Sequence, residues 1–173
     1  MKQLMILVLL SIPMLSVGQN KAINNFYQKY KTYKNVTNVS LGGWVLKLAT
    51  KYADDDEAKE ALRHVSRLKV LFMENGNIVE KTDVKQLLRQ VRNDDFEELM
   101  TIQDGKSKVN IFIKENKKAI TNLLIVVNGE DDFVLLSLKG ELDFEDLSKL
   151  NIDVEGGEYL KKVPKKKKLI PQA

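Results

Sequence analysis

The chain of 173 residues contains no cysteine, and this absence excludes several kinds of chemistry. Disulfide bonds, thiol catalysis and a lipid anchor on a cysteine at a cleavage site all require a thiol. Secreted chains use disulfides mainly when the hydrophobic core is too small to hold the fold. We therefore expect a core that suffices unaided, a property that suits a bacterial envelope better than an animal extracellular fluid.

Histidine and tryptophan each occur once, which leaves few residues for acid–base catalysis or ring stacking. His64 falls in a stretch with helical spacing, where we expect a helix-surface or boundary side chain rather than a general base. Trp44 stands beside Gly42-Gly43. We expect it to anchor the core where a strand gives way to a helix, with ligand stacking as the alternative.

Sequence motifs for catalysis are also missing. No serine lies in a G-x-S-x-G elbow, and Gly42-Gly43 lacks the Gly and Lys of a phosphate-binding loop. The sequence therefore predicts a protein that is not an enzyme, with no catalytic, cofactor-binding or metal-binding residue and no cofactor. A nucleophile–His–acid triad stays open because the members of a triad come together in space and not in sequence. A pair of carboxylates for glycoside hydrolysis also stays open, but acidic residues are too numerous for the sequence to select the pair.

Two acidic clusters resemble cation sites at first inspection. Asp54-Asp55-Asp56-Glu57 is contiguous and precedes a helix, whereas calcium loops space their acids around a central glycine. We expect this cluster to cap the helix and complement its dipole. Glu130-Asp131-Asp132 follows Asn128-Gly129 and is expected to be a solvated hairpin turn.

Residues 1–18 have the pattern of a secretory signal peptide. Lys2 is followed by an apolar run around Met5 to Leu10, and Ser16-Val17-Gly18 places small residues at the cleavage site. The run is too short for a bilayer core of about 30 Å, so a transmembrane anchor is the weaker interpretation. We predict cleavage between Gly18 and Gln19, export to the periplasm or beyond it, and no transmembrane segment in the mature chain.

The net charge of +4 has an uneven distribution along the chain. Residues 19–160 carry 24 acidic against 21 basic side chains, and residues 161–173 carry six lysines without an acid. Such like-charge runs are typical of flexible tails. The sequence therefore predicts no nucleic-acid partner for the body of the protein. The candidate residues for binding an anionic surface are Lys161, Lys162, Lys165, Lys166, Lys167 and Lys168.

Apolar residues at helical spacing predict four helices before residue 95 and a fifth over residues 143–150. Thr82 or Asp83 is expected to cap the fourth helix. The core-facing sets are Ile23, Phe26, Tyr27 and Tyr30; Val45, Leu48, Ala49 and Tyr52; Ala58, Ala61, Leu62 and Val65; and Val84, Leu87, Leu88 and Val91.

Strand patterns occur at residues 35–41 and 68–73 and then four times over residues 96–139. Turn residues at 104–105, 115–116 and 128–129 separate the last four strands, as in an antiparallel meander. Val109, Ile111 and Ile113 alternate with polar residues, which predicts one face in the core and one towards water. Residues 123–127 are apolar throughout, which is typical of a strand covered on both faces.

Several short motifs follow one another in a characteristic order along the chain. They are Phe26-Tyr27-x-x-Tyr30, Val36-Thr37-Asn38-Val39-Ser40-Leu41, Trp44-Val45-Leu46-Lys47-Leu48-Ala49, Leu68-Lys69-Val70-Leu71, Asn75-Gly76 and Leu138-Lys139-Gly140-Glu141-Leu142. In this order the chain resembles a family of small exported proteins of Gram-negative bacteria known as a domain of unknown function. The resemblance covers residues 22–150, excludes the leader and the tail, and implies an envelope location and no known catalytic residues.

We therefore predict a signal peptide (1–18), one α+β domain (19–152) and a flexible Lys-rich tail (153–173). The domain is expected to be an antiparallel meander of four to six strands packed against several helices. The leading functional hypothesis is a non-enzymatic, envelope-associated binding or maintenance module whose partner is an envelope protein or an anionic surface. The alternatives are a small carboxylate-dependent hydrolase assisted by His64, and a structural protein held to anionic surfaces by its tail.

Overall fold

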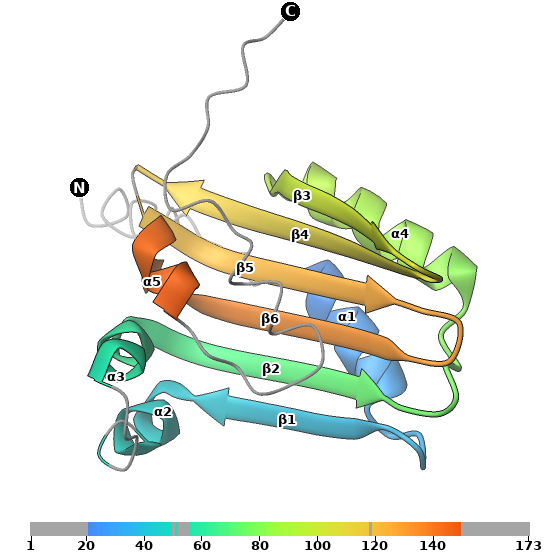
Figure 1. Cartoon of the computed structure of the whole chain (residues 1–173), viewed down its shortest axis with the longest axis horizontal. Helices are drawn as coiled ribbons and strands as arrows, with labels where there is room; N and C mark the ends of the chain where they lie inside the picture. The colour runs from blue at the N-terminus through green and yellow to red at the C-terminus, as the bar shows by residue number, and fades with distance from the viewer. Residues whose placement is uncertain (1–20, 50, 52–55, 118, 150–173) are drawn as a thin grey trace, which may run out of the picture.

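Six antiparallel strands form one sheet with helices on both of its faces (Figure 1). The computed structural model describes residues 21–49, 51, 56–117 and 119–149. The predicted signal peptide and the Lys-rich tail lie outside the described residues. The strands are β1 (Thr37–Gly42), β2 (Val65–Met73), β3 (Glu97–Asp104), β4 (Ser107–Asn116), β5 (Ala119–Asn128) and β6 (Phe133–Leu142).

The strand order β1-β2-β6-β5-β4-β3 combines a meander with two strands from the N-terminal half. Strands β3 to β6 follow each other through short turns, as the sequence predicted, but Glu115 and Asn116 are the last residues of β4 and the turn comes after them. Strand β2 then pairs with β6, so that β1 and β3 become the two edges of the sheet. The prediction of an α+β fold with an antiparallel sheet of four to six strands is confirmed.

Five helices accompany the sheet in the described part of the chain, and none of them is long and apolar enough to cross a bilayer. Helices α1 and α4 lie behind the sheet in the view of Figure 1, and α2, α3 and α5 lie in front of one end. The helices are α1 (Lys21–Tyr30), α2 (Gly43–Ala49), α3 (Asp56–Arg63), α4 (Lys81–Asn93) and α5 (Phe144–Lys149).

Each face of the sheet has its own hydrophobic core, because successive strand residues point to opposite faces. The rear core joins the apolar stripes of α1 and α4 to residues such as Phe112, Leu124 and Leu135. The front core contains Ile111, Ile125 and their neighbours together with residues of α2 and α5. The prediction that residues 123–127 are buried on both faces is confirmed.

Strand β4 is more buried than its alternation predicted. Asn110 and Phe112 are buried as well as the three apolar residues on the other face. Phe112 belongs to the rear core, and the Arg92 guanidinium of α4 lies over its ring. The buried Asn110 amide donates hydrogen bonds of 3.0 Å to Glu98 and Thr101, so its burial leaves no unpaired polar group. The predicted water-facing side was therefore wrong in the middle of this strand.

Predictions for the second and third helices need three corrections. Trp44 was expected to anchor the core, but 75% of its surface is exposed, and Leu46 is the buried residue of α2. Leu48 is exposed as well, because α2 spans only seven residues and turns a different face to the sheet. His64 lies after the end of α3, and Val65 begins β2 rather than completing the helix stripe.

Helix α4 differs from its prediction at one end and on one face. Glu80, not Thr82 or Asp83, is the N-cap residue, and its side chain makes no capping hydrogen bond. Val84, Leu87 and Val91 are buried as predicted, whereas Leu88 is only partly buried at the margin of the rear core.

Candidate functional site

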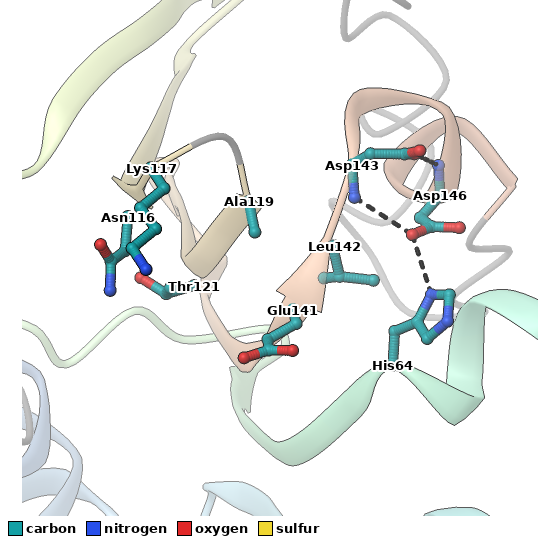
Figure 2. Close-up of a pocket in the computed structure, with 9 residues that line it drawn as sticks. All are labelled: His64, Asn116, Lys117, Ala119, Thr121, Glu141, Leu142, Asp143 and Asp146. Carbon is teal, nitrogen blue, oxygen red and sulfur yellow. Dashed lines mark hydrogen bonds and ion pairs between the residues drawn. The ribbon is translucent and has the colours of Figure 1, made fainter.

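The described residues offer two surfaces for function, and the first is an open pocket of about 550 Å³ beside His64 (Figure 2). The β4–β5 turn supplies one wall, and the end of β6 with the start of α5 supplies the other. Three acidic side chains line it, namely Glu141, Asp143 and Asp146. His64 Nδ1 lies 3.0 Å from Asp146 Oδ2, and 43% of the His64 side chain is exposed.

The two aspartates of this pocket also organise the start of α5. The Asp146 amide donates to Asp143 Oδ1 at 2.7 Å, and the Asp143 amide donates to Asp146 Oδ2 at 3.1 Å. This reciprocal pair is the arrangement of a capping box, in which two side chains satisfy orphan amides at a helix start. Asp146 therefore has a structural role that is independent of any ligand.

The pocket has an oriented imidazole but lacks an available hydroxyl nucleophile among its lining residues. Thr121 carries the hydroxyl group of the lining, and that hydroxyl donates to the Lys114 carbonyl oxygen at 3.0 Å. An imidazole held by a carboxylate can move a proton. Among the described residues, no group of three or more acidic or histidine side chains is placed to hold a metal ion.

The second surface is the edge of the sheet at β1. Its sequence, TNVSLG, contains no charge and no proline, and its register with β2 has no bulge. Charged residues, prolines and β-bulges are common on edge strands, because they block pairing with another chain. The opposite edge strand, β3, has two of these features: it contains three acidic residues, and its register shifts between Glu98 and Met100. Strand β1 is therefore the unguarded edge of this sheet.

Exposed apolar side chains gather on β1 and on the helix that follows it. Val39 is 39% exposed, Trp44 75% and Leu48 45%. These three residues and strand β1 are called the β1 edge surface below. Tryptophan is one of the residue types enriched among the hot spots of binding interfaces.

A pocket lies at each end of the β1 edge surface. The first, of about 350 Å³, is lined by residues that include Thr37, Phe72 and Asn75. The second, of about 320 Å³, is lined by residues that include Trp44 and Arg63. A strand of six residues spans about 20 Å, so a segment paired with β1 would reach both pockets.

Basic side chains lie on the rear side of this edge. Lys69 of β2 pairs in register with Ser40, and its Nζ donates to Asn24 at 2.8 Å and lies over the Tyr27 ring. Burial lowers the pKa of the Lys69 amine, and the positive charges of Arg67 and Lys31 lower it further. The crowding of three cations makes this place favourable for a negatively charged group.

The structure separates the residues that the sequence singled out. His64 meets Asp146 across 82 positions of sequence, and Trp44 lies on the β1 edge surface instead of in the core. The six lysines proposed for anionic surfaces lie outside the described residues. The acidic residues 130–132 occupy the β5–β6 turn as expected, where the Gly129 amide donates to the Asp132 carbonyl oxygen at 3.0 Å.

Comparison with known proteins gives one match. The model of a family described as "Domain of unknown function (DUF4252)" matches residues 30–150, which span β1 to α5. No curated protein and no solved structure matches the chain. The resemblance to a domain of unknown function, expected for residues 22–150, is confirmed.

Proposed function

Because this chain belongs to the DUF4252 family, whose description assigns no activity, we propose a function from its own geometry. The protein is an exported, non-enzymatic binding module of the cell envelope. It takes up an extended segment of a partner protein at β1 by strand addition. Main-chain hydrogen bonds to an exposed sheet edge supply affinity in this mode, and pockets for alternate side chains supply specificity.

The observation that carries the proposal is the contrast between the two sheet edges. An uncharged edge without bulge or proline is a hazard for a stable protein, since it templates pairing with other chains. Strand β1 has this composition, whereas β3 has acidic residues and a bulge. The exposed Trp44 at the end of β1 adds an anchor of the residue type most enriched among binding hot spots.

The two sides of the edge indicate the chemistry of the partner. An added strand turns alternate side chains to the front, beside Val39 and Leu41, and to the rear, beside the basic group of Lys31, Arg67 and Lys69. The fitting segment therefore alternates apolar with acidic residues. It also carries a side chain for the pocket beside Trp44.

Export belongs to the proposal and has its own test. The pattern of residues 1–18 supports cleavage between Gly18 and Gln19. Intact-mass measurement of the protein purified from its own cells is expected to give a chain that begins at Gln19. A mature species that retains residues 1–18 would refute this part of the proposal.

A site-directed cross-link tests the binding surface. Because the chain has no cysteine, an introduced cysteine is its only thiol and is labelled at one known position. Ser40→Cys on β1 and Gln103→Cys on β3 each introduce a single thiol, to which a photoactivatable reagent is attached. Illumination of intact cells and sequencing of the cross-linked peptide identify what lies beside each edge. We expect a partner segment with alternating acidic and apolar residues from Ser40→Cys, and none from Gln103→Cys.

Two further variants make the cross-link specific. Val39→Lys adds the charge that edge strands normally use against pairing, and it is expected to abolish the product at residue 40. Trp44→Ala is expected to lower the yield of the cross-linked partner about tenfold or more, as truncation of a hot-spot residue does. The control is Ile78→Ala, which changes an exposed apolar residue between β2 and α4 and is expected to leave the yield unchanged. Equal yields at residues 40 and 103, or a product made only of this chain, would refute the proposal.

The His64–Asp146 pair favours a second candidate, the small hydrolase in which His64 assists carboxylates. The pair lies in an open pocket with Glu141, where an oriented imidazole can transfer a proton (Figure 2). A screen of the mature protein against glycoside and ester substrates tests it. Activity that falls about 100-fold in a folded His64→Ala variant would establish this candidate, since that is the effect of removing a general base.

A further inference from the structure

The front face of the sheet is buried well beyond the reach of the described helices. Helices α2, α3 and α5 lie over the end where β6 finishes and β2 begins (Figure 1). At the opposite end, a group of apolar residues forms two rows across four strands, and none is more than 5% exposed. This distal patch consists of Val70, Val109, Ile111, Ile125, Val127, Val134 and Leu136.

The register places these residues on one continuous surface. Val109 pairs with Val127, which pairs with Val134; Ile111 pairs with Ile125, which pairs with Leu136. A bare patch of this size would expose several hundred Å² of apolar surface, which monomeric proteins avoid unless it is an interface. The distal patch therefore needs a cover, and the described residues do not supply one.

We propose that residues 151–160 form this cover by docking along the distal patch. The position of α5 selects this segment. Phe144 and Leu147 of α5 pack in the front core, so the chain that leaves Lys149 starts on the face that needs the cover. Residues 1–20, in contrast, lead into α1, whose buried side chains all belong to the rear core.

The composition and length of residues 151–160 fit the patch. Ile152 and Val154 alternate with Asp153 and Glu155, so an extended segment turns its apolar side chains to the sheet and its carboxylates to water. Tyr159 and Leu160 add further apolar surface after a Gly-Gly pair. Ten extended residues span about 33 Å, which equals the length of the ten-residue strands beneath them.

Docking of this segment changes the boundary of the folded domain. The domain then ends near Leu160, and the lysine run of residues 161–168 begins directly at the surface of the sheet. The inference does not depend on strand addition at β1, since it rests on the burial of the front face, where Val70 of the patch pairs with Val39 of β1.

Point variants of the full chain test the docking. Ile152→Asp and Val154→Asp place charges against the patch, and each is expected to lower the midpoint of urea unfolding and to increase the fluorescence of a dye that binds apolar surface. The matched controls Asp153→Asn and Glu155→Gln change the water-facing side and are expected to leave both readouts unchanged. Equal effects of the two pairs would refute the proposal.

Truncation supplies a second test. A chain that ends at Leu160 is expected to match the full chain in urea midpoint and dye binding. A chain that ends at Lys149 is expected to bind the dye strongly or to lose its fold. The inference would be overturned if the chain that ends at Lys149 kept its urea midpoint and did not bind the dye. A strong loss of stability in the chain that ends at Leu160 would also overturn it. Dimeric full-length protein whose dissociation exposes the patch would also overturn it, since the cover would then be a second copy.

Discussion

Gly140 of β6 approaches the main chain of His64 so closely that a Cβ atom at residue 140 would lie 2.2 Å from the His64 carbonyl oxygen. The same carbonyl accepts a hydrogen bond of 3.0 Å from the Glu141 amide. The contact falls where the β2–β6 register shifts, between Val65 and Arg67. A glycine is required here by close approach of two backbones, not by an unusual dihedral angle.

Gly140→Ala is therefore expected to destabilise the protein by more than about 1 kcal/mol, since the clash is with backbone that cannot rotate away. Gly42→Ala is the control, because its nearest neighbour would be the flexible Trp44 side chain at 3.8 Å. Urea titration of both variants measures the difference. Equal midpoints would show that the β2–β6 junction relaxes without cost.

Leu87 of α4 is expected to be the most sensitive leucine of its helix. It is 2% exposed in the rear core, whereas Leu88 lies at the margin. Leu87→Ala should lower the free energy of unfolding by about 2–5 kcal/mol, through lost transfer energy and a cavity. Leu88→Ala should cost less, and Lys85→Ala should stay within about 0.5 kcal/mol. A ranking with Leu88 above Leu87 would contradict the observed face of α4.

Asp83 is expected to make stability depend on pH. Hydrogen bonds from Lys29 and Tyr30 lower the pKa of the Asp83 carboxyl, and they connect α1 to α4. A carboxyl whose pKa is lower in the folded state stabilises the fold above its unfolded pKa of about 3.9, and this contribution is lost as pH falls through the folded pKa.

The test compares Asp83→Asn with the parent protein between about pH 7 and pH 2. At neutral pH the variant should be the less stable protein, and the gap should shrink as the pH falls below about 4. Asp131→Asn, which changes an exposed carboxyl in the β5–β6 turn, serves as the control. A gap that stays constant with pH would show that the ion pair does not contribute through its charge.

The six lysines of the tail are expected to bind anionic membranes weakly. Each lysine near such a surface contributes about 1 kcal/mol at low ionic strength, and salt screens the attraction. Full-length protein should sediment with phosphatidylserine vesicles at low salt, and a chain that ends at Leu160 should not. Equal binding of the two chains would identify the run as a solubilising end only.

Much of the local structure followed from the sequence because it depends on near neighbours. The stripe of α1 reflects a repeat of 3.6 residues, and the turn at Asn128-Gly129 reflects the turn preference of these two residues. The errors arose where another element decides the outcome. Phe112 is buried because the rear helices cover its face, and Trp44 is exposed because α2 turns Leu46 to the sheet.

The functional surfaces also depend on contacts between elements that are far apart in the sequence. The sequence by itself determined that β1 is a strand, that His64 has no neighbour in sequence for catalysis, and that thiol chemistry is excluded. Only the tertiary structure decided that β1 is an unguarded edge and that His64 meets Asp146, because both depend on pairing between segments far apart in the chain. Strand pairing is set by the burial of two whole faces at once, and no local window of sequence contains that information.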